Sequence, residues 1–422
     1  MAKRLTSMVL AAACLTWCAV AVAQPPAQLP GGMPFPPLAG PPPVDFVPAE
    51  APVGGLLGPV FSPPETGSTE PIVHFGYEFL MWSVSRQRAN PLVTSGSAFD
   101  PVPGALGQPN TTVLLNRFDQ DHMHQGGRLS MGVGLDSRSD WAIQGTGFWL
   151  DERQFQYRFK ANGESGGIVL ARPFYNVVSK MQDADPAAFP LIASGAIDIK
   201  GYRRVDGFDV DLRYLYLEGT DSRLVFLAGG AYFALQEGVT IRMTSQDLPG
   251  IGAPGNLYHL SEDFTTRNTF YGAQFGADYE FHVGPVFLKS VAKLGVGNVT
   301  QTVNRNPFIS ITETTGIVTS SSDRALYISP ANAGKSSRSC FAVMPEASFK
   351  VGIDLNRYVQ VSVGYSVLYL NNVLRSTEQI DRNVIVQPVG TTDTFGSRGH
   401  APTFRQNDFT AQGLDAMLRL SF

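Results

Sequence analysis

The chain has 422 residues, of which 16% are charged and 11% aromatic, with 43 glycines and a formal net charge of -4. This balance argues against a nucleic-acid partner, because proteins that bind nucleic acids concentrate basic side chains on one surface. A chain poor in charge and rich in glycine and aromatic residues instead suits many strands that face an apolar environment.

The first 23 residues have the pattern of a secretory signal peptide. Lys3 and Arg4 precede an apolar run over 8–23, which ends in Ala21-Val22-Ala23. We expect cleavage between Ala23 and Gln24, since an A-x-A site follows the apolar run. No other stretch reaches 18 consecutive apolar residues, so we expect no transmembrane helix in the mature chain.

Residues 24–71 differ sharply in composition from the rest. They hold 15 of the 30 prolines, mixed with glycine and alanine. Such a segment builds neither a strand ladder nor a core, so we expect an extended, disordered linker here and a folded domain over 72–422.

Alternation of apolar and polar side chains recurs ten times after residue 72. It is clearest in 359–369, where valine and tyrosine alternate with glutamine, serine and glycine. The other predicted strands are 75–81, 128–135, 141–153, 208–214, 223–243, 271–281, 286–303, 347–353 and 413–422. A period of two is the pattern of strands with one apolar face.

The predicted connections alternate strictly between long and short. The short ones are 137–140, 219–222, 282–285 and 355–357, and the long ones are 86–127, 154–206, 244–268, 304–341 and 371–408. Outer-membrane barrels have short periplasmic turns and long external loops. An even number of strands then places both ends of the domain on the periplasmic side.

The final strand ends on Phe422, which resembles the signal that outer-membrane barrels present to their assembly machinery. An open strand edge does not survive in lipid, so this strand has to close a barrel. The prediction is an all-β fold, a single antiparallel up-and-down transmembrane barrel of about ten strands, with twelve as the alternative. The edge strand of a soluble β-sandwich remains open as a different reading of these residues.

In a membrane barrel the polar face of each strand turns inward. The predicted interior collects charges of both signs: Glu78, Arg128, Asp209, Asp211, Arg213, Asp278, Glu280, Lys289, Lys293, Glu346, Lys350, Asp415 and Arg419. Ten strands make a narrow barrel, in which opposite charges should pair. The sequence favours an interior plugged by paired charges, with a small polar pore as the alternative.

Several motifs resemble one family in order along the chain. They include Asn90-Pro-Leu-Val-Thr-Ser-Gly96, Gly126-Gly-Arg-Leu-Ser-Met-Gly132, Leu170-Ala-Arg-Pro-Phe174, Lys293-Leu-Gly-Val-Gly-Asn298 and Gln379-Ile-Asp381. Together these resemble the bacterial beta-barrel protein 7 family over about residues 73–422. The chain departs from the family at Arg375-Ser-Thr377, where Arg-Pro-Gly is usual. The resemblance implies an outer-membrane barrel and carries over no functional residues, because the family has no established activity.

Two sets of residues could carry chemistry. Asp119, Asp121, His122 and His124 place four potential metal ligands within six residues. Asp119, His124 and His259 could supply the Asp and His residues that ten-stranded outer-membrane proteases use near their outer rim. No spacing requires either site, so we expect no enzyme, metal or cofactor. The expected role is structural or surface-interacting, with outer-membrane lipid and the assembly machinery as partners; a narrow pore and a loop-borne enzyme are the alternatives.

Overall fold

The computed structural model describes residues 73–118, 123–136, 140–248, 255–322, 324–386 and 404–422. The predicted leader and linker lie outside these residues. The elements are β1 (Val73–Val84), β2 (Arg88–Gly96), β3 (Thr112–Arg117), β4 (His124–Gly134), β5 (Trp141–Ala161), β6 (Val169–Asn176), β7 (Met181–Ala188), β8 (Ala193–Glu218), β9 (Ser222–Asp247), β10 (Leu257–Val283), β11 (Val286–Thr312), β12 (Val318–Ser321), β13 (Gly334–Asn356), β14 (Val359–Leu374), the 3₁₀ turn η1 (Ser376–Gln379), β15 (Asn383–Val384) and β16 (Gln406–Ser421).

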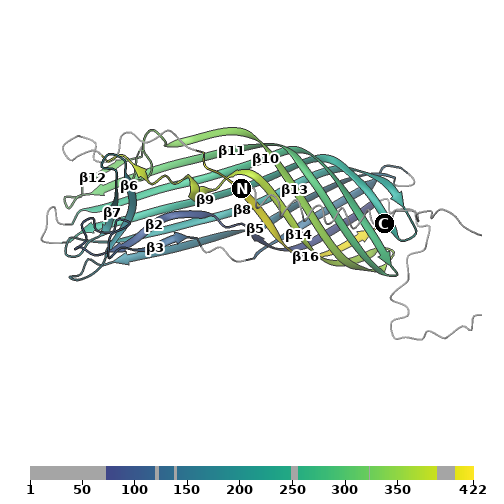
Figure 1. The fold of residues 1–422 in the computed structure, drawn as a ribbon, viewed down its shortest axis with the longest axis horizontal. Helices are drawn as coiled ribbons and strands as arrows, with labels where there is room; N and C mark the ends of the chain where they lie inside the picture. The colour runs from purple at the N-terminus through teal and green to yellow at the C-terminus, as the bar shows by residue number, and fades with distance from the viewer. Residues whose placement is uncertain (1–72, 119–122, 137–139, 249–254, 323, 387–403) are drawn as a thin grey trace, which may run out of the picture. The chain divides into compact units, whose positions relative to one another are not determined.

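Ten strands of the described chain form a closed antiparallel barrel (Figure 1). Their order around the ring is β1, β4, β5, β8, β9, β10, β11, β13, β14 and β16, and β16 pairs back with β1. Phe422 continues this seam, because its backbone exchanges two hydrogen bonds with Val73, at 3.1 and 2.9 Å. The all-β barrel of ten strands is therefore confirmed, and the twelve-strand and sandwich alternatives are wrong. No described helix is long and apolar enough to cross a membrane, a finding that does not bear on strands.

The two faces of the barrel wall differ near the short turns. On β1 the side chains of Phe75 and Tyr77 are 45% and 41% exposed, whereas Glu78 is 6% exposed. Exposed apolar side chains continue from the short turns toward the long-loop end as far as Trp149 on β5 and Phe341 on β13. Here 'above' means nearer the long-loop end. These side chains form a belt that suits lipid.

Beyond the belt the wall continues as what we call the extension, made of the long-loop ends of β5, β8, β9, β10, β11 and β13. Here the sense of the alternation is reversed. On β8 the inward side chains of Ile197 and Ile199 are fully buried, while the outward Lys200 is exposed. Nearer the short turn, the outward Phe208 is apolar and the inward Asp211 is charged. The predicted long connections 154–206, 244–268 and 304–341 are thus largely strand. That prediction was wrong because it required one unchanging apolar face.

A second sheet occupies the long-loop end of the barrel. Its order is β15-β6-β2-β3, with β7 paired to β6. In Figure 1 the strands β2, β3, β6 and β7 gather at one end of the barrel. They share a buried apolar cluster with the inward face of the extension, in which Leu92 and Phe174 join Ile199, Ile241 and Phe264. The connections 86–127 and 371–408 therefore contain ordered elements that the sequence analysis missed.

Candidate functional site in the barrel interior

The charged residues predicted for the interior gather in its short-turn half and pair across the lumen. Arg128 on β4 lies 3.3 Å from Glu78 on β1 and 2.8 Å from Glu346 on β13. Lys350 on β13 also pairs with Glu78. Since β4 and β13 lie nearly opposite each other in the ring, the Arg128–Glu346 pair bridges the lumen.

Two further clusters lie beside this one. Lys293 on β11 contacts Asp209 at 3.0 Å and Asp211 at 2.8 Å, both on β8. The second cluster holds Arg213–Asp278 at 3.1 Å, Lys289–Asp278 at 3.1 Å and Lys289–Glu280 at 3.0 Å. Asp415 accepts a hydrogen bond from Ser366 at 3.1 Å. Arg419 makes no such ion pair within the described chain, and its buried Nε has no hydrogen-bond partner there.

Above these charges the interior is apolar, which the sequence analysis did not predict. Leu80, Trp82, Phe233, Phe270 and Phe409 are fully buried and belong to one cluster. The rings of Phe233 on β9 and Phe409 on β16 lie 5.3 Å apart, although their strands stand on opposite sides of the ring. The sequence does carry the signal, because Leu80 and Trp82 follow Glu78 in the same phase.

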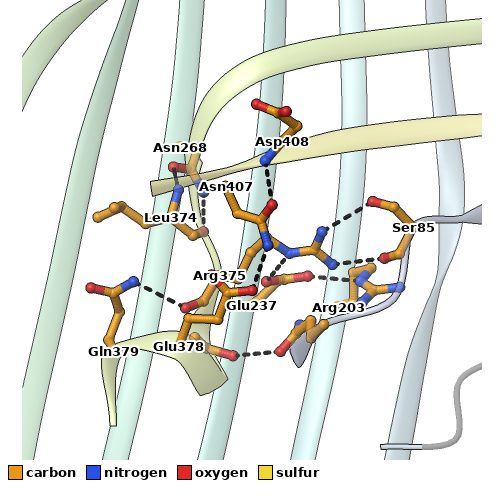
Figure 2. Close-up of polar contacts among 12 residues, drawn as sticks. Ser85, Arg203, Glu237, Asn268, Leu374, Arg375, Glu378, Gln379, Asn407 and Asp408 are labelled. Carbon is orange, nitrogen blue, oxygen red and sulfur yellow. Dashed lines mark hydrogen bonds and ion pairs between the residues drawn. The ribbon is translucent and has the colours of Figure 1, made fainter. Parts of the chain in front are cut away.

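A strap of residues 374–380 crosses the lumen above this apolar layer. Figure 2 shows Arg375 from the strap and Arg203 from β8 on either side of Glu237 from β9. The Nε groups of Arg375 and Arg203 donate to the two carboxylate oxygens at 3.0 and 2.8 Å. Arg375 also donates to the Oγ and backbone oxygen of Ser85, at 3.1 and 2.9 Å. All three charged side chains are at most 1% exposed.

The same strap is held at its start by a side-chain amide. Asn268 on β10 donates to the backbone oxygen of Leu374 at 2.8 Å and accepts from its N–H at 2.7 Å, as Figure 2 shows. Charge-assisted and two-way bonds of this kind fix a segment in one position. The strap is thus fixed by polar contacts to β9, to β10 and to Ser85, the residue that follows β1.

A second buried ion pair joins the extension to the sheet of β15, β6, β2, β3 and β7, which we call the inner sheet. Arg172 on β6 pairs with Glu262 on β10, which also accepts the backbone N–H of Ile328 at 3.1 Å. The guanidinium lies 4.6 Å from the centre of the Tyr327 ring. Burial raises the pKa of Tyr327 to about 12. Asp185 pairs with Arg172 in the sheet, and burial raises the pKa of its carboxyl to about 6.

The candidate catalytic residues do not come together. His124 on β4 is 2% exposed, and its Nδ1 lies 3.3 Å from the backbone oxygen of Asp151. His259 lies on β10, and β5, β8 and β9 separate the two strands. Asp119, Asp121 and His122 lie outside the described residues. Within the described ranges no group of three or more His, Cys, Asp or Glu side chains is arranged to hold a metal ion.

With this barrel in view, a family model described as "Putative beta barrel porin-7 (BBP7)" matches residues 74–422. The chain belongs to this family. The match confirms the resemblance that the ordered motifs predicted. As a member of the porin-7 family, the chain has a porin-like barrel as its folded domain, and no curated protein matches it.

Solved barrels resemble the chain only distantly. The outer membrane protease OmpT from Escherichia coli is 11% identical, with a TM-score of 0.39 over 85% of this chain and 99% of that one. The toluene transporter TodX of Pseudomonas putida is 8% identical, with a TM-score of 0.15 over 86% of this chain and 94% of that one. Likeness at this level carries no argument about activity, so the function has to be argued from the interior itself.

Proposed function

We propose that this protein is a bacterial outer-membrane barrel with a closed lumen, whose extension presents a rigid surface outside the cell. A cleaved leader over 1–23 would direct export, and a linker over 24–71 would tether the barrel in the periplasm. Lipid would surround the apolar belt, and the assembly machinery would recognise Phe422. The role is structural or surface-interacting and not catalytic.

The apolar layer is the observation that carries this proposal. Leu80, Trp82, Phe233, Phe270 and Phe409 pack into one buried apolar cluster that spans the lumen, and the strap with its buried ions lies on the long-loop side of it. An ion on this path would lose its hydration without gaining polar partners, which is costly. The polar half of the lumen nearer the short turns favours a second candidate, a narrow pore that opens when the strap moves.

Planar-bilayer recording on the refolded mature chain tests the choice between these candidates. We expect no stepwise conductance from the native protein, with insertion verified by its resistance to added protease. Stable conductance steps in symmetric salt would instead support the narrow pore. Fractionation of cells checks the location independently, because a closed barrel should sediment with the outer membrane.

The orientation is testable with inserted epitope tags. Gly316 lies in an exposed turn with φ of +85° and has open space where a side chain would point, so an insertion there should be tolerated. A tag at Gly316 should be labelled on intact cells, whereas a tag at Thr220, in a short turn, should be labelled only after the outer membrane is opened. The reverse pattern would invert the topology. Ser137 and Gly390, in the predicted short connection 137–140 and long connection 371–408, would suit the same test and lie outside the described residues.

A further inference from the structure

The outward face of the extension changes character directly above the lipid belt. The last large apolar side chains of the belt are Trp149 on β5, Phe208 on β8, Tyr232 on β9 and Tyr271 on β10. Beyond them, the same face carries amide, hydroxyl and basic side chains together with the carboxylates of Asp198, Asp206 and Asp263. Register is continuous along β9, β10 and β11, so these polar residues stand directly above the belt.

Arginines occupy the first polar level. Arg204 on β8 and Arg267 on β10 align with each other across Gln236 of β9. The side chain of Arg204 is 59% exposed and lies 2.9 Å from Glu152. At a rise of about 3.3 Å per residue and a strand tilt of about 40°, four residues beyond Phe208 or Tyr271 correspond to roughly 10 Å of height. Polar headgroups extend roughly 5–8 Å beyond each side of the hydrocarbon core, so the backbone of both arginines stands just beyond this layer and their long side chains can reach back into it.

A depression of about 400 Å³ lies above the arginines. It is lined by Gln154, Gln156, Lys200, Tyr202, Thr240 and the backbone of Gly238. The ring of Tyr202 lies over Gly238 so closely that a side chain at this position would have to displace the ring. The amides of Gln154 and Gln156 donate to the carboxylates of Glu152 and Asp198. Together with the Lys200 ammonium, these amides and carboxylates form a set that hydrogen-bonds hydroxyl-rich ligands.

A second depression, of about 430 Å³, continues this surface upward. Thr244, His259 and Ser310 align across β9, β10 and β11, and Arg242, Ser261 and Phe308 align one level below them. The ring of Phe308 is 43% exposed. A guanidinium, an imidazole and three hydroxyls beside an exposed aromatic ring suit a saccharide that carries anionic groups.

We infer that this outward wall binds the phosphorylated saccharide headgroup of an outer-leaflet glycolipid, with the arginines at its phosphates and the lower depression at its sugars. The distance of the lower depression from the belt favours this ligand over a phospholipid. The lower depression stands roughly 12–20 Å beyond the belt, by the same rise and tilt. That is beyond the reach of a phospholipid headgroup, whereas a glycolipid with several sugar units extends that far. The inference rests on the proposed outer-membrane location.

Binding to the refolded mature chain in detergent, followed by native mass spectrometry, tests the inference. The probes are lipopolysaccharide with a phosphorylated core saccharide, lipid A without the core, phosphatidylglycerol, and the free core oligosaccharide. We expect the core-bearing lipopolysaccharide to bind at least tenfold more tightly than lipid A. The free oligosaccharide should bind more weakly than the intact glycolipid, since the belt and the wall act together.

Variants separate the two levels of the wall. Gln156→Ala with Lys200→Ala should reduce binding of the core-bearing lipopolysaccharide about tenfold and leave lipid A binding unchanged. Arg204→Ala with Arg267→Ala should weaken both. Gln412→Ala is the matched control, because Gln412 is exposed on β16, outside the extension, and should change neither.

Equal binding of lipopolysaccharide and lipid A would overturn the inference, as would a Gln156 and Lys200 variant that binds like the native chain. If phosphatidylglycerol bound as tightly as lipopolysaccharide, the wall would attract anionic lipids without recognising a saccharide, and the inference would be wrong. If the free core oligosaccharide bound as tightly as intact lipopolysaccharide, the lipid part would not contribute to binding and the glycolipid assignment would be wrong. These outcomes are distinct from a failure of the proposed function, which shows instead as stable conductance or as recovery outside the outer membrane.

Discussion

Val363 and Ser362 are neighbours on β14 whose exposures differ tenfold, at 64% and 6%. If the exposed face meets lipid, Val363 lies near the middle of the belt. An arginine at the midplane on the lipid face costs roughly 2–4 kcal/mol. We therefore expect Val363→Arg to lower the free energy of unfolding in vesicles by about that amount. Gln154→Arg is the control, since Gln154 lies on the polar wall above the belt, and its change should stay within about 0.5 kcal/mol.

A lipid-dissolved quencher distinguishes a lipid-facing position of Val363 from a position in a packed core, where the arginine would also be destabilising. A fluorophore attached at Val363→Cys should be quenched strongly, and one attached at Ser362→Cys should not. Protection at both positions would mean that no lipid-facing wall exists there.

Asp185, a half-buried residue with one buried carboxyl oxygen, illustrates how an acidic group makes stability depend on pH. Burial raises the pKa of its carboxyl from an ordinary 3.8 to about 6. Arg172 acts to lower this pKa, and Glu262 acts to raise it. Between these values the folded protein holds a proton that the unfolded chain releases. The stabilising contribution is therefore complete below pH 4 and is lost as the pH rises through 6.

Asp185→Asn should remove this dependence, because its amide stays neutral. The variant should match the native protein at pH 4 and exceed its stability by about 1–2 kcal/mol at pH 7, a value reduced for partial exposure. Thermal unfolding between pH 4 and 8 measures the difference. Asp263→Asn on the outer wall serves as the control. A difference that does not change with pH would show that Asp185 acts through packing alone.

Among the elements, the strap is held by polar groups, so its attachment should be separable from the barrel. Arg375→Ala removes the bonds to Glu237 and Ser85 and leaves Glu237 with only one cation. Breaking a buried pair costs about 3–5 kcal/mol, and here the loss should fall on the strap. We expect hydrogen exchange over 374–380 to accelerate by a hundredfold or more, while β1 and β16 keep their protection.

Arg405→Ala supplies the matched control for this change. Its ion pair with Asp381, at 3.3 Å, is partly exposed. Such pairs contribute about 0–1 kcal/mol, so exchange in the strap should hardly change. Equal effects of the two substitutions would mean that the strap is held by packing against the apolar layer and not by Arg375.

The elements also show which parts of the fold could be read from the sequence. All ten barrel strands were predicted, because each has one unbroken apolar face within the belt. The extension was missed where that face reverses, as between Ile199 and Phe208 on β8. A period-two analysis that allows this reversal would have found it. The strap and the inner sheet could not be predicted, because Arg375, Glu237 and Arg203 meet only once the ring is closed.

For the molecule as a whole, closure depends on the seam between β1 and β16. There Phe422 adds two backbone bonds to Val73, and its ring stacks on Tyr358 with centroids 6.2 Å apart. Its ring is nevertheless 66% exposed, so its packing adds little to stability. If the assembly machinery recognises Phe422, as we propose, the residue should affect assembly far more than stability.

Deletion of Phe422 separates these two roles when yield is compared in cells and in vesicles. Because the residue is largely exposed, spontaneous refolding into vesicles should change by no more than about 1 kcal/mol. Assembly in cells should fall several-fold, since the machinery would lose its signal, and Phe422→Tyr should restore it. Ser421→Ala, one residue earlier, is the control that keeps the terminal ring. If the deletion reduced refolding and cellular assembly alike, Phe422 would act only by closing the seam, and recognition by the machinery would have to be sought elsewhere in β16.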